Sequence, residues 1–112
     1  MCGDRVEVWV KQTADGRIAE TGFEARGCAI SIASADLMAE AVAGRTPEEA
    51  RALFARFRAM ARSGASADDD ALLQRLRPLA GVHEYPSRVK CATLPWHALL
   101  AALDGQGVGT SE

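Results

Sequence analysis

Four side chains of this sequence are suited to bind a metal or to carry sulfur: Cys2, Asp4, Cys28 and Cys91. Thiolates are strong ligands for zinc and nucleophiles toward sulfur, and a carboxylate can complete a tetrahedral set of ligands. The cysteines form no CxxC pair, and because their number is odd they cannot all be joined in disulfides. The alternative interpretation is that they are buried as small apolar side chains without a chemical role.

Each cysteine is expected near the beginning of a secondary-structure element. Cys2 precedes a strand pattern, Cys28 follows a glycine where a helix pattern begins, and Cys91 lies in an early turn of the last predicted helix. The positive end of a helix dipole favours the thiolate form of a cysteine. Side chains two residues apart on a strand point the same way, so Cys2 and Asp4 can face one centre. The sequence therefore predicts a zinc site with Cys2, Asp4, Cys28 and Cys91 as ligands.

The charge of this ligand set requires cationic neighbours. Three thiolates and one carboxylate carry four negative charges against the two positive charges of zinc, and Arg88 and Lys90 lie within three residues of Cys91. We expect these two side chains to give the site electrostatic support. A carboxylate is a poorer match for zinc than a thiolate, so such a site could exchange a ligand.

Other candidate ligands have more ordinary interpretations. Asp68, Asp69 and Asp70 are expected in the first turn of a helix, where acidic side chains complement the helix dipole. His83 is expected in an exposed loop, and His97 is expected on a helix surface or in a satisfied core position.

The elements that must position the ligands can be predicted from hydrophobic periodicity. Residues 5–25 predict an antiparallel hairpin, with Val6, Val8 and Val10 on its buried face and turn residues at 13–16. An apolar helix is expected from about residue 28 to 43, ending at Gly44.

Besides the helix that begins near residues 66–70, two further helices are expected along the chain. Thr46, Pro47 and Glu49 predict a capped helix start, followed by a helix with Leu53, Phe57 and Met60 on one stripe. A last helix is expected over about residues 86–103, interrupted at Pro95. Proline has no N–H to give to the carbonyl four residues earlier, that of Cys91, so the backbone should kink or open beside this cysteine. Trp96 is expected in the core, and Trp9 on the exposed face of the hairpin, where it is a candidate contact for a partner.

Composition indicates one ordinary domain. The chain has 112 residues, of which 48% are hydrophobic and 25% charged, with a formal net charge of -2. We predict one domain over residues 1–104 and a flexible tail over 105–112. Basic residues are interspersed with acidic ones, which argues against nucleic acid as a partner. No apolar stretch reaches the ~20 residues that cross a bilayer, and no signal segment is evident, so we expect no membrane partner and a cytoplasmic location.

Three stretches resemble a known family. CGDRVEVWV, GFEARGCAISIASADLMAEAVAG and YPSRVKCATLPWHALLAAL are similar to the three signature regions of the IscU/NifU-N family of iron–sulfur cluster assembly proteins. Within that family the chain resembles the SufU-like branch, which binds zinc and accepts sulfur. The long segment between Cys28 and Cys91 and the lysine at position 90 carry this finer resemblance. Family members normally have a helix and an extended segment before CGD, where this chain has only Met1, so a third strand or a docking surface is expected to be absent.

The resemblance implies a fold and a function. The fold is α+β, a small antiparallel sheet with helices packed on one face. Cys2, Asp4, Cys28 and Cys91 would bind zinc. The partner would be a pyridoxal-phosphate-dependent, SufS-like cysteine desulfurase, and a histidine of that partner would take over one zinc position. Cys2 would then be free to accept sulfur from the persulfide of the desulfurase, and Arg88 would steady the site or meet the partner. The sulfur would pass on to a downstream iron–sulfur scaffold.

Two other functions stay open at this point. The chain could be an IscU-like scaffold that binds iron and assembles a transient [2Fe-2S] cluster, because three thiolates and a carboxylate can also hold iron. It could also be a structural zinc domain used only for binding. Whether the chain acts as an enzyme, a zinc-dependent sulfurtransferase, is left open.

Overall fold

The computed structural model describes residues 5–27, 29–63, 86–105 and 108–111. The helix predicted to begin near residues 66–70 and the loop containing His83 lie outside these ranges. The described elements, in chain order, are β1 (Arg5–Gln12), β2 (Ile18–Arg26), α1 (Ala29–Val42), α2 (Pro47–Ser63), α4 (Pro86–Asp104) and β3 (Val108–Ser111).

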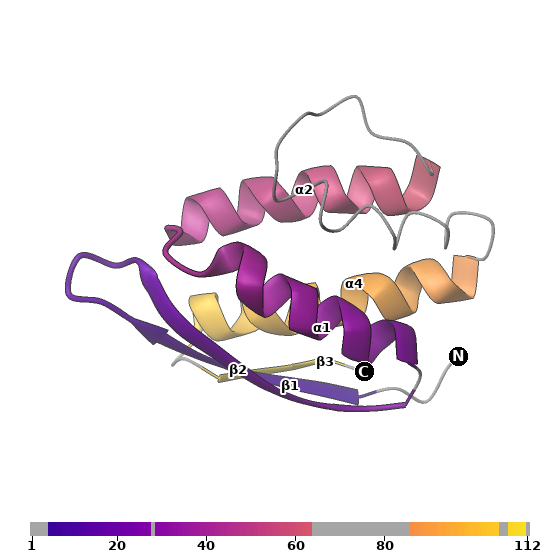
Figure 1. The fold of residues 1–112 in the computed structure, drawn as a ribbon, viewed down its shortest axis with the longest axis horizontal. Helices are drawn as coiled ribbons and strands as arrows, with labels where there is room; N and C mark the ends of the chain where they lie inside the picture. Colours follow the sequence, from indigo (N-terminus) through magenta and orange to yellow (C-terminus); the bar gives the residue numbers. More distant parts are fainter. Residues whose placement is uncertain (1–4, 28, 64–85, 106–107, 112) are drawn as a thin grey trace.

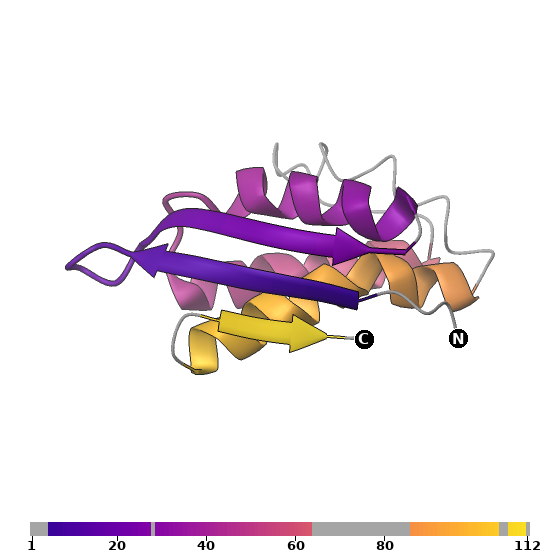
Figure 2. The same cartoon turned by 90° about the horizontal axis from the view of Figure 1, so that it is seen from below.

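The strands form one antiparallel sheet, in the order β2-β1-β3, and helices cover one of its faces (Figure 2). Helix α1 contacts β2, and α4 contacts both β1 and β3. Helix α2 packs against α4 on the side away from the strands, which gives a third layer (Figure 1). The α+β class, with helices on one face of a small antiparallel sheet, is confirmed. Within the described ranges, none of the helices combines the length and apolarity that a membrane span requires.

The predicted hairpin is present, with the expected buried face. Strands β1 and β2 pair from Arg5↔Arg26 to Gln12↔Ile18, and a five-residue connection joins them. Val6 and Val8 are completely buried beneath the helices. Gly16 adopts a φ of 88° in the connection, a left-handed conformation that glycine reaches without a steric penalty.

Helix α1 ends where the sequence predicts. Gly44 has a φ of 79°, as expected for the residue that closes a helix. Its N–H donates to the carbonyl of Ile18 at 2.7 Å, and the N–H of Ile18 donates to the carbonyl of Arg45 at 2.8 Å. The end of α1 is therefore tied to the beginning of β2.

Helix α2 begins with the predicted capping box. The N–H of Glu49 donates to Thr46 Oγ1 at 3.2 Å, and Glu49 Oε1 accepts from the N–H of Thr46 at 3.1 Å. Two N–H groups that a helix start leaves without partners are satisfied in this way. Leu53, Phe57 and Met60 are buried along one stripe, as predicted.

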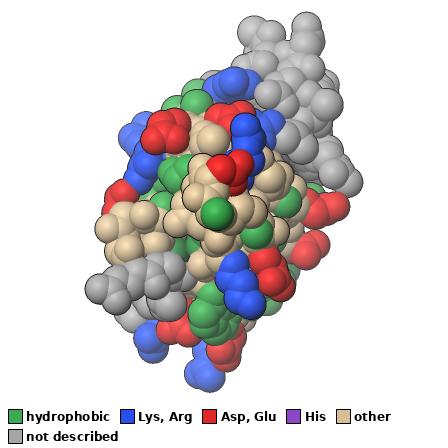
Figure 3. All heavy atoms as spheres, turned by 90° about the vertical axis from the view of Figure 1, so that its left-hand side faces the viewer, with side chains coloured by type: hydrophobic (Ala, Val, Ile, Leu, Met, Phe, Trp, Pro, Cys, Tyr) green, Lys and Arg blue, Asp and Glu red, His purple; other side chains and the backbone are tan. Residues whose placement is uncertain are grey.

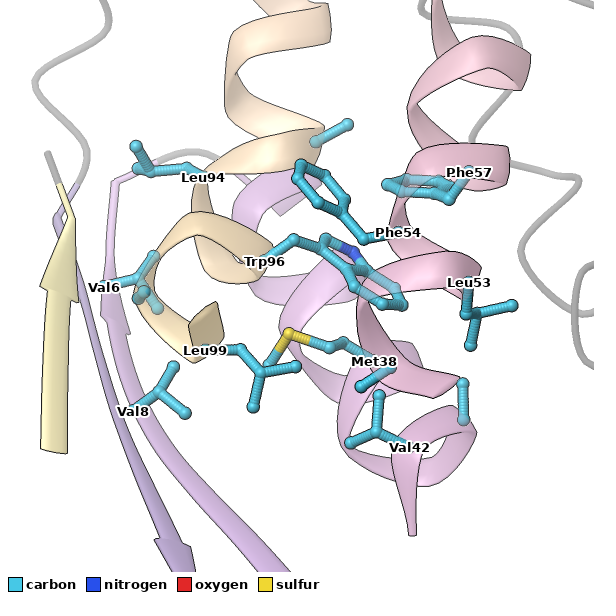
Figure 4. Close-up of a cluster of buried hydrophobic side chains, with 14 of the residues drawn as sticks. Val6, Val8, Met38, Val42, Leu53, Phe54, Phe57, Leu94, Trp96 and Leu99 are labelled. Carbon is cyan, nitrogen blue, oxygen red and sulfur yellow. The ribbon is translucent and has the colours of Figure 1, made fainter. Parts of the chain in front are cut away.

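Trp96 forms the centre of the core, between the helices (Figure 4). Its indole stacks on Phe54 at a centroid distance of 5.8 Å and packs against Phe57 at 5.2 Å. The core prediction for Trp96 is confirmed. Strands, α1, α2 and α4 all contribute to this cluster, which includes Val6, Val8, Ile18, Met38, Val42, Leu53, Phe57, Leu94, Trp96 and Leu99.

The prediction of a domain ending at residue 104 with a flexible tail over 105–112 differs from the structure. Val108–Ser111 forms β3 and pairs with β1 from Val6↔Ser111 to Trp9↔Val108. The glycine-rich composition suggested mobility, but ladder hydrogen bonds join backbone groups and need no particular side chain. The second edge of β1 offers those groups, so the C-terminal segment supplies the third strand.

Candidate metal centre

Of the four predicted ligands, Cys91 lies among the described residues. Its side chain is completely buried, in the second turn of α4 between the exposed Arg88 and the proline at position 95. Cys2, Asp4 and Cys28 lie outside the described residues, so the four-ligand set stays a prediction. What the structure describes is the set of elements that lead to these positions.

Those elements meet at one end of the sheet. Arg5, the first residue of β1, is paired with Arg26, the last residue of β2, so the chain enters β1 and leaves β2 at the same end. Helix α1 begins at Ala29, directly after position 28, and its first turn lies at this end together with the first turns of α4 (Figure 1). The segments that flank all four predicted ligands are therefore neighbours.

Two buried hydrogen bonds join the first turns of α1 to α4. The hydroxyl of Ser31 donates to the carbonyl of Cys91 at 3.0 Å, and the hydroxyl of Ser34 donates to the carbonyl of Ala92 at 2.5 Å. Both serines are completely buried. Ser31 is three residues after Cys28, so the first turn of α1 lies directly beside Cys91.

Gly27 makes the transition from β2 to α1 with a φ of 114°. Side chains other than glycine rarely adopt such a conformation, so the residue type at 27 is required by the backbone. The glycine determines the direction in which the chain turns immediately before Cys28.

The interruption predicted at Pro95 does not break the helix, and a donor from α1 reaches the carbonyl that loses its helical hydrogen bond. Helix α4 continues through Pro95, whose nitrogen has no hydrogen to give to the carbonyl of Cys91. Ser31 donates to that carbonyl instead. Sequence reasoning missed Ser31 and Ser34 altogether. The available signal was the pair of serines three residues apart in an otherwise apolar run, which places two hydroxyls on the same helix face.

The donor chemistry of Cys91 fits a metal such as zinc. Thiolate sulfur is a ligand that zinc prefers, and burial beside a helix start excludes water from it. Arg88 and Lys90 are both exposed, and their electrostatic support for the site stays a prediction. Within residues 5–27, 29–63, 86–105 and 108–111, no three His, Cys, Asp or Glu side chains gather as a metal site.

His97 lies on the helix surface, which confirms the first of its two interpretations. Its ring meets Phe54 edge-on at a centroid distance of 5.2 Å. Partial burial in this contact lowers the pKa of His97, and the nearby Arg58 guanidinium lowers it further. His97 is six residues beyond Cys91, and it lies on the side of α4 that contacts Phe54 of α2.

The outer face of the sheet carries charged side chains and one tryptophan. A hollow of about 240 Å³ is lined by Arg5, Glu7, Glu24 and Arg26. Trp9, two residues beyond Glu7 on the same face of β1, is 40% exposed as predicted, and its role as a partner contact stays a prediction. At the hairpin end of the molecule, basic and acidic side chains are interspersed, without a field of one sign (Figure 3).

Comparison with known proteins gives one consistent family. The chain matches the NifU-like N terminal domain over residues 1–92. It is 42% identical over 99 residues to the zinc-dependent sulfurtransferase SufU of Bacillus subtilis (strain 168), covering 88% of this chain and 65% of that protein. It is 40% identical over 102 residues to the iron–sulfur cluster assembly scaffold protein IscU of Streptococcus pyogenes serotype M1, covering 91% of this chain and 63% of that protein.

A solved structure gives the same result for the fold. A candidate iron–sulfur cluster assembly scaffold protein for the SUF system from Fervidobacterium islandicum AW-1 superposes with a TM-score of 0.79 at 35% identity. The superposition covers 91% of this chain and 73% of the other. The chain spans just under two thirds of the length of the two curated relatives.

Proposed function

Because this chain belongs to the NifU-like N-terminal domain family, we propose that it is a SufU-like sulfur-transfer protein of iron–sulfur cluster assembly. In this function, Cys2, Asp4, Cys28 and Cys91 bind zinc. Cys2 accepts sulfane sulfur from a pyridoxal-phosphate-dependent cysteine desulfurase and passes it to a downstream iron–sulfur scaffold. The similarity to the zinc-dependent sulfurtransferase SufU supports this choice within the family.

The observation that carries the proposal is the hydrogen bond between Ser31 and Cys91. It joins the first turn of α1, which directly follows Cys28, to the turn of α4 that bears Cys91, although 60 residues separate the two partners in sequence. The pairing of Arg5 with Arg26 brings the segment after Cys2 and Asp4 to the same end. A shared cation is the simplest use of thiols and a carboxylate that belong to segments meeting at one end of the sheet.

Zinc bound at this site would hold the thiols as thiolates at neutral pH. In the transfer step, the Cys2 thiolate attacks the outer sulfur of the desulfurase persulfide. An S–S bond forms at Cys2 and the donor S–S bond breaks, so the donor cysteine leaves as a thiolate and Cys2 becomes a persulfide. Charge and electrons balance within this exchange, and no additional oxidant or reductant is needed.

Metal analysis and a sulfur-transfer assay test the proposal together. We expect purified protein to be colourless, with about one zinc per chain, as a four-ligand site implies. With a cysteine desulfurase and cysteine, the zinc form should accelerate alanine release, and mass spectrometry should find one added sulfur atom on Cys2. Cys2→Ser should abolish both the acceleration and the added mass. Acceleration that survives Cys2→Ser would overturn the assignment of the acceptor.

A second function has its own support in the similarity to the scaffold protein IscU. A scaffold would turn red-brown when reconstituted anaerobically with iron and sulfide, and it would pass the cluster to an apo-protein. A structural zinc domain would bind zinc but give no acceleration of the desulfurase. The sulfur-transfer assay and the cluster reconstitution therefore separate all three functions.

A further inference from the structure

The carbonyl of Cys91 lacks the hydrogen bond that an uninterrupted helix would give it. The donor in a regular helix would be the N–H of residue 95, and Pro95 has none. A buried carbonyl without a partner destabilises a fold, so such groups are satisfied in folded proteins. Here the hydroxyl of Ser31 supplies a bond at 3.0 Å, from a different helix.

This replacement joins the Cys91 turn of α4 to α1. In a regular helix, the carbonyl of Cys91 would be held by its own helix. Because Ser31 donates to it, a hydrogen bond connects the Cys91 turn to the first turn of α1, which directly follows position 28. The two cysteine-bearing segments are thus joined by a hydrogen bond next to the predicted metal.

We propose that Ser31 is a positioning residue for the metal centre: its hydroxyl replaces the N–H that Pro95 lacks and so holds the Cys91 turn of α4 against the first turn of α1. The proposal rests on the proposed zinc-binding function. It assigns one coupled role to Ser31 and Pro95. Pro95 does not give the Cys91 carbonyl its helical hydrogen bond, and the Ser31 hydroxyl donates to that carbonyl in its place.

The coupling predicts an unusual pattern of zinc affinities. Ser31→Ala removes the donor from α1, the turn relaxes, and zinc affinity should fall about tenfold or more, as for other groups that orient a ligand. Pro95→Ala restores an N–H at position 95, which can donate to Cys91 in the ordinary helical manner. The double variant Ser31→Ala/Pro95→Ala should therefore bind zinc more tightly than Ser31→Ala alone.

The test is a double-mutant cycle on the full-length protein. Zinc affinity is measured by competition with a chromophoric chelator for wild type, Ser31→Ala, Pro95→Ala and the double variant. Cobalt is then substituted for zinc, and the absorption bands of the cobalt form report the ligand geometry. Ser31→Ala should shift these bands and the double variant should restore them. A merely structural role would lower stability without changing the bands of the folded, cobalt-loaded protein.

Two control variants accompany the cycle. Ser31→Thr keeps a hydroxyl and should keep both affinity and cobalt bands. Ser34→Ala removes an equally buried hydroxyl from the same helix. The carbonyl of Ala92, which this hydroxyl binds, can still accept from the backbone N–H of Trp96 in the helical manner. Ser34→Ala should therefore lower stability and leave the cobalt bands unchanged, and adding Pro95→Ala should not compensate for it.

The outcomes separate the two proposals. Wild-type protein that binds no zinc overturns both the proposed function and this inference. Wild-type protein that binds zinc, together with equal affinity for Ser31→Ala, overturns only the inference. Additive effects of the two substitutions, with no recovery in the double variant, also overturn it. Should Ser31→Ala fail to fold, recovery of folding and zinc binding by the added Pro95→Ala change supports the coupling, and no recovery contradicts it.

Discussion

The indole N–H of Trp96 donates to the hydroxyl of Ser34 at 3.2 Å, inside the core. The same hydroxyl donates to the carbonyl of Ala92 at 2.5 Å. Both side chains are completely buried, so water cannot replace either bond. Ser34 therefore joins α1 to α4 at the largest core side chain, one turn of α1 beyond Ser31.

We predict that Ser34→Ala lowers the free energy of unfolding by about 1–3 kcal/mol, because the Trp96 indole N–H is then buried without its acceptor. Chemical denaturation followed by tryptophan fluorescence measures the change. Asp36→Ala removes an exposed polar side chain from the same helix and serves as the control, because a surface substitution of this kind should not lower the free energy of unfolding by more than about 0.5 kcal/mol. Equal stabilities of Ser34→Ala and wild type would contradict the role of the buried bond.

Thr21 is a position where a substitution is expected to stabilise the fold. Its Oγ1 is buried and has no hydrogen-bond partner within the described residues. Thr21→Val keeps the shape of the side chain and removes the unsatisfied hydroxyl, so we expect stabilisation by about 1 kcal/mol. Thermal unfolding measures it, and a lower melting temperature for the variant would show that the hydroxyl is satisfied in solution.

The capping box of α2 predicts a pH dependence at acid pH. The hydrogen bond from the Thr46 N–H holds the pKa of Glu49 below its ordinary value of 4.5. A carboxylate with a lowered pKa contributes stability above its unfolded pKa and loses it as the pH falls through its folded value. The advantage of wild type over Glu49→Gln should therefore be constant near neutrality and shrink below pH 4.5. Denaturation curves at a series of pH values check this, and a pH-independent difference would contradict it.

His97 predicts a second pH dependence, of a different origin. Burial against Phe54, with Arg58 nearby, lowers the pKa of His97 below its ordinary value of 6.5. As the pH falls below 6.5, the unfolded chain takes up a proton that the folded chain resists, so stability falls until the folded pKa is reached. His97→Gln should remove this part of the acid destabilisation.

NMR titration of the histidine rings measures the pKa of His97 directly, and His97→Gln identifies its resonance against that of His83. Arg58→Gln should move the pKa of His97 back toward 6.5, because the nearby positive charge is gone. A titration of His97 at or above 6.5 in wild type would contradict the environment that the structure gives it.

The C-terminal strand predicts a truncation phenotype. Deletion of residues 106–112 removes β3 and exposes the edge of β1, so amides within Val6–Trp9 should exchange with solvent about tenfold faster or more. Hydrogen exchange followed by NMR measures the effect, and amides of β2 serve as the internal control. Unchanged exchange in β1 would contradict the pairing and support the prediction of a flexible tail made from the sequence.

Local patterns in the sequence predicted most of the fold. The alternation of Val6 and Val8, the cap at Thr46 and Glu49, and the glycine at 44 each depend on neighbours within four residues, so they could be recognised without the fold. The cysteine motifs identified the family in the same way, because each signature is a short contiguous stretch. These features account for the hairpin, the helices and the proposed ligands.

The tertiary structure decided which remote segments meet. The pairing of β3 with β1, and the bond from Ser31 to the carbonyl that Pro95 leaves open, join residues far apart in sequence. The sequence of one partner does not indicate which residue the other will be. A strand edge can pair with any strand of matching register, and a carbonyl without its helical donor can accept from any hydroxyl within reach. Only the packing of α1, α4 and the sheet brings these groups within hydrogen-bonding distance.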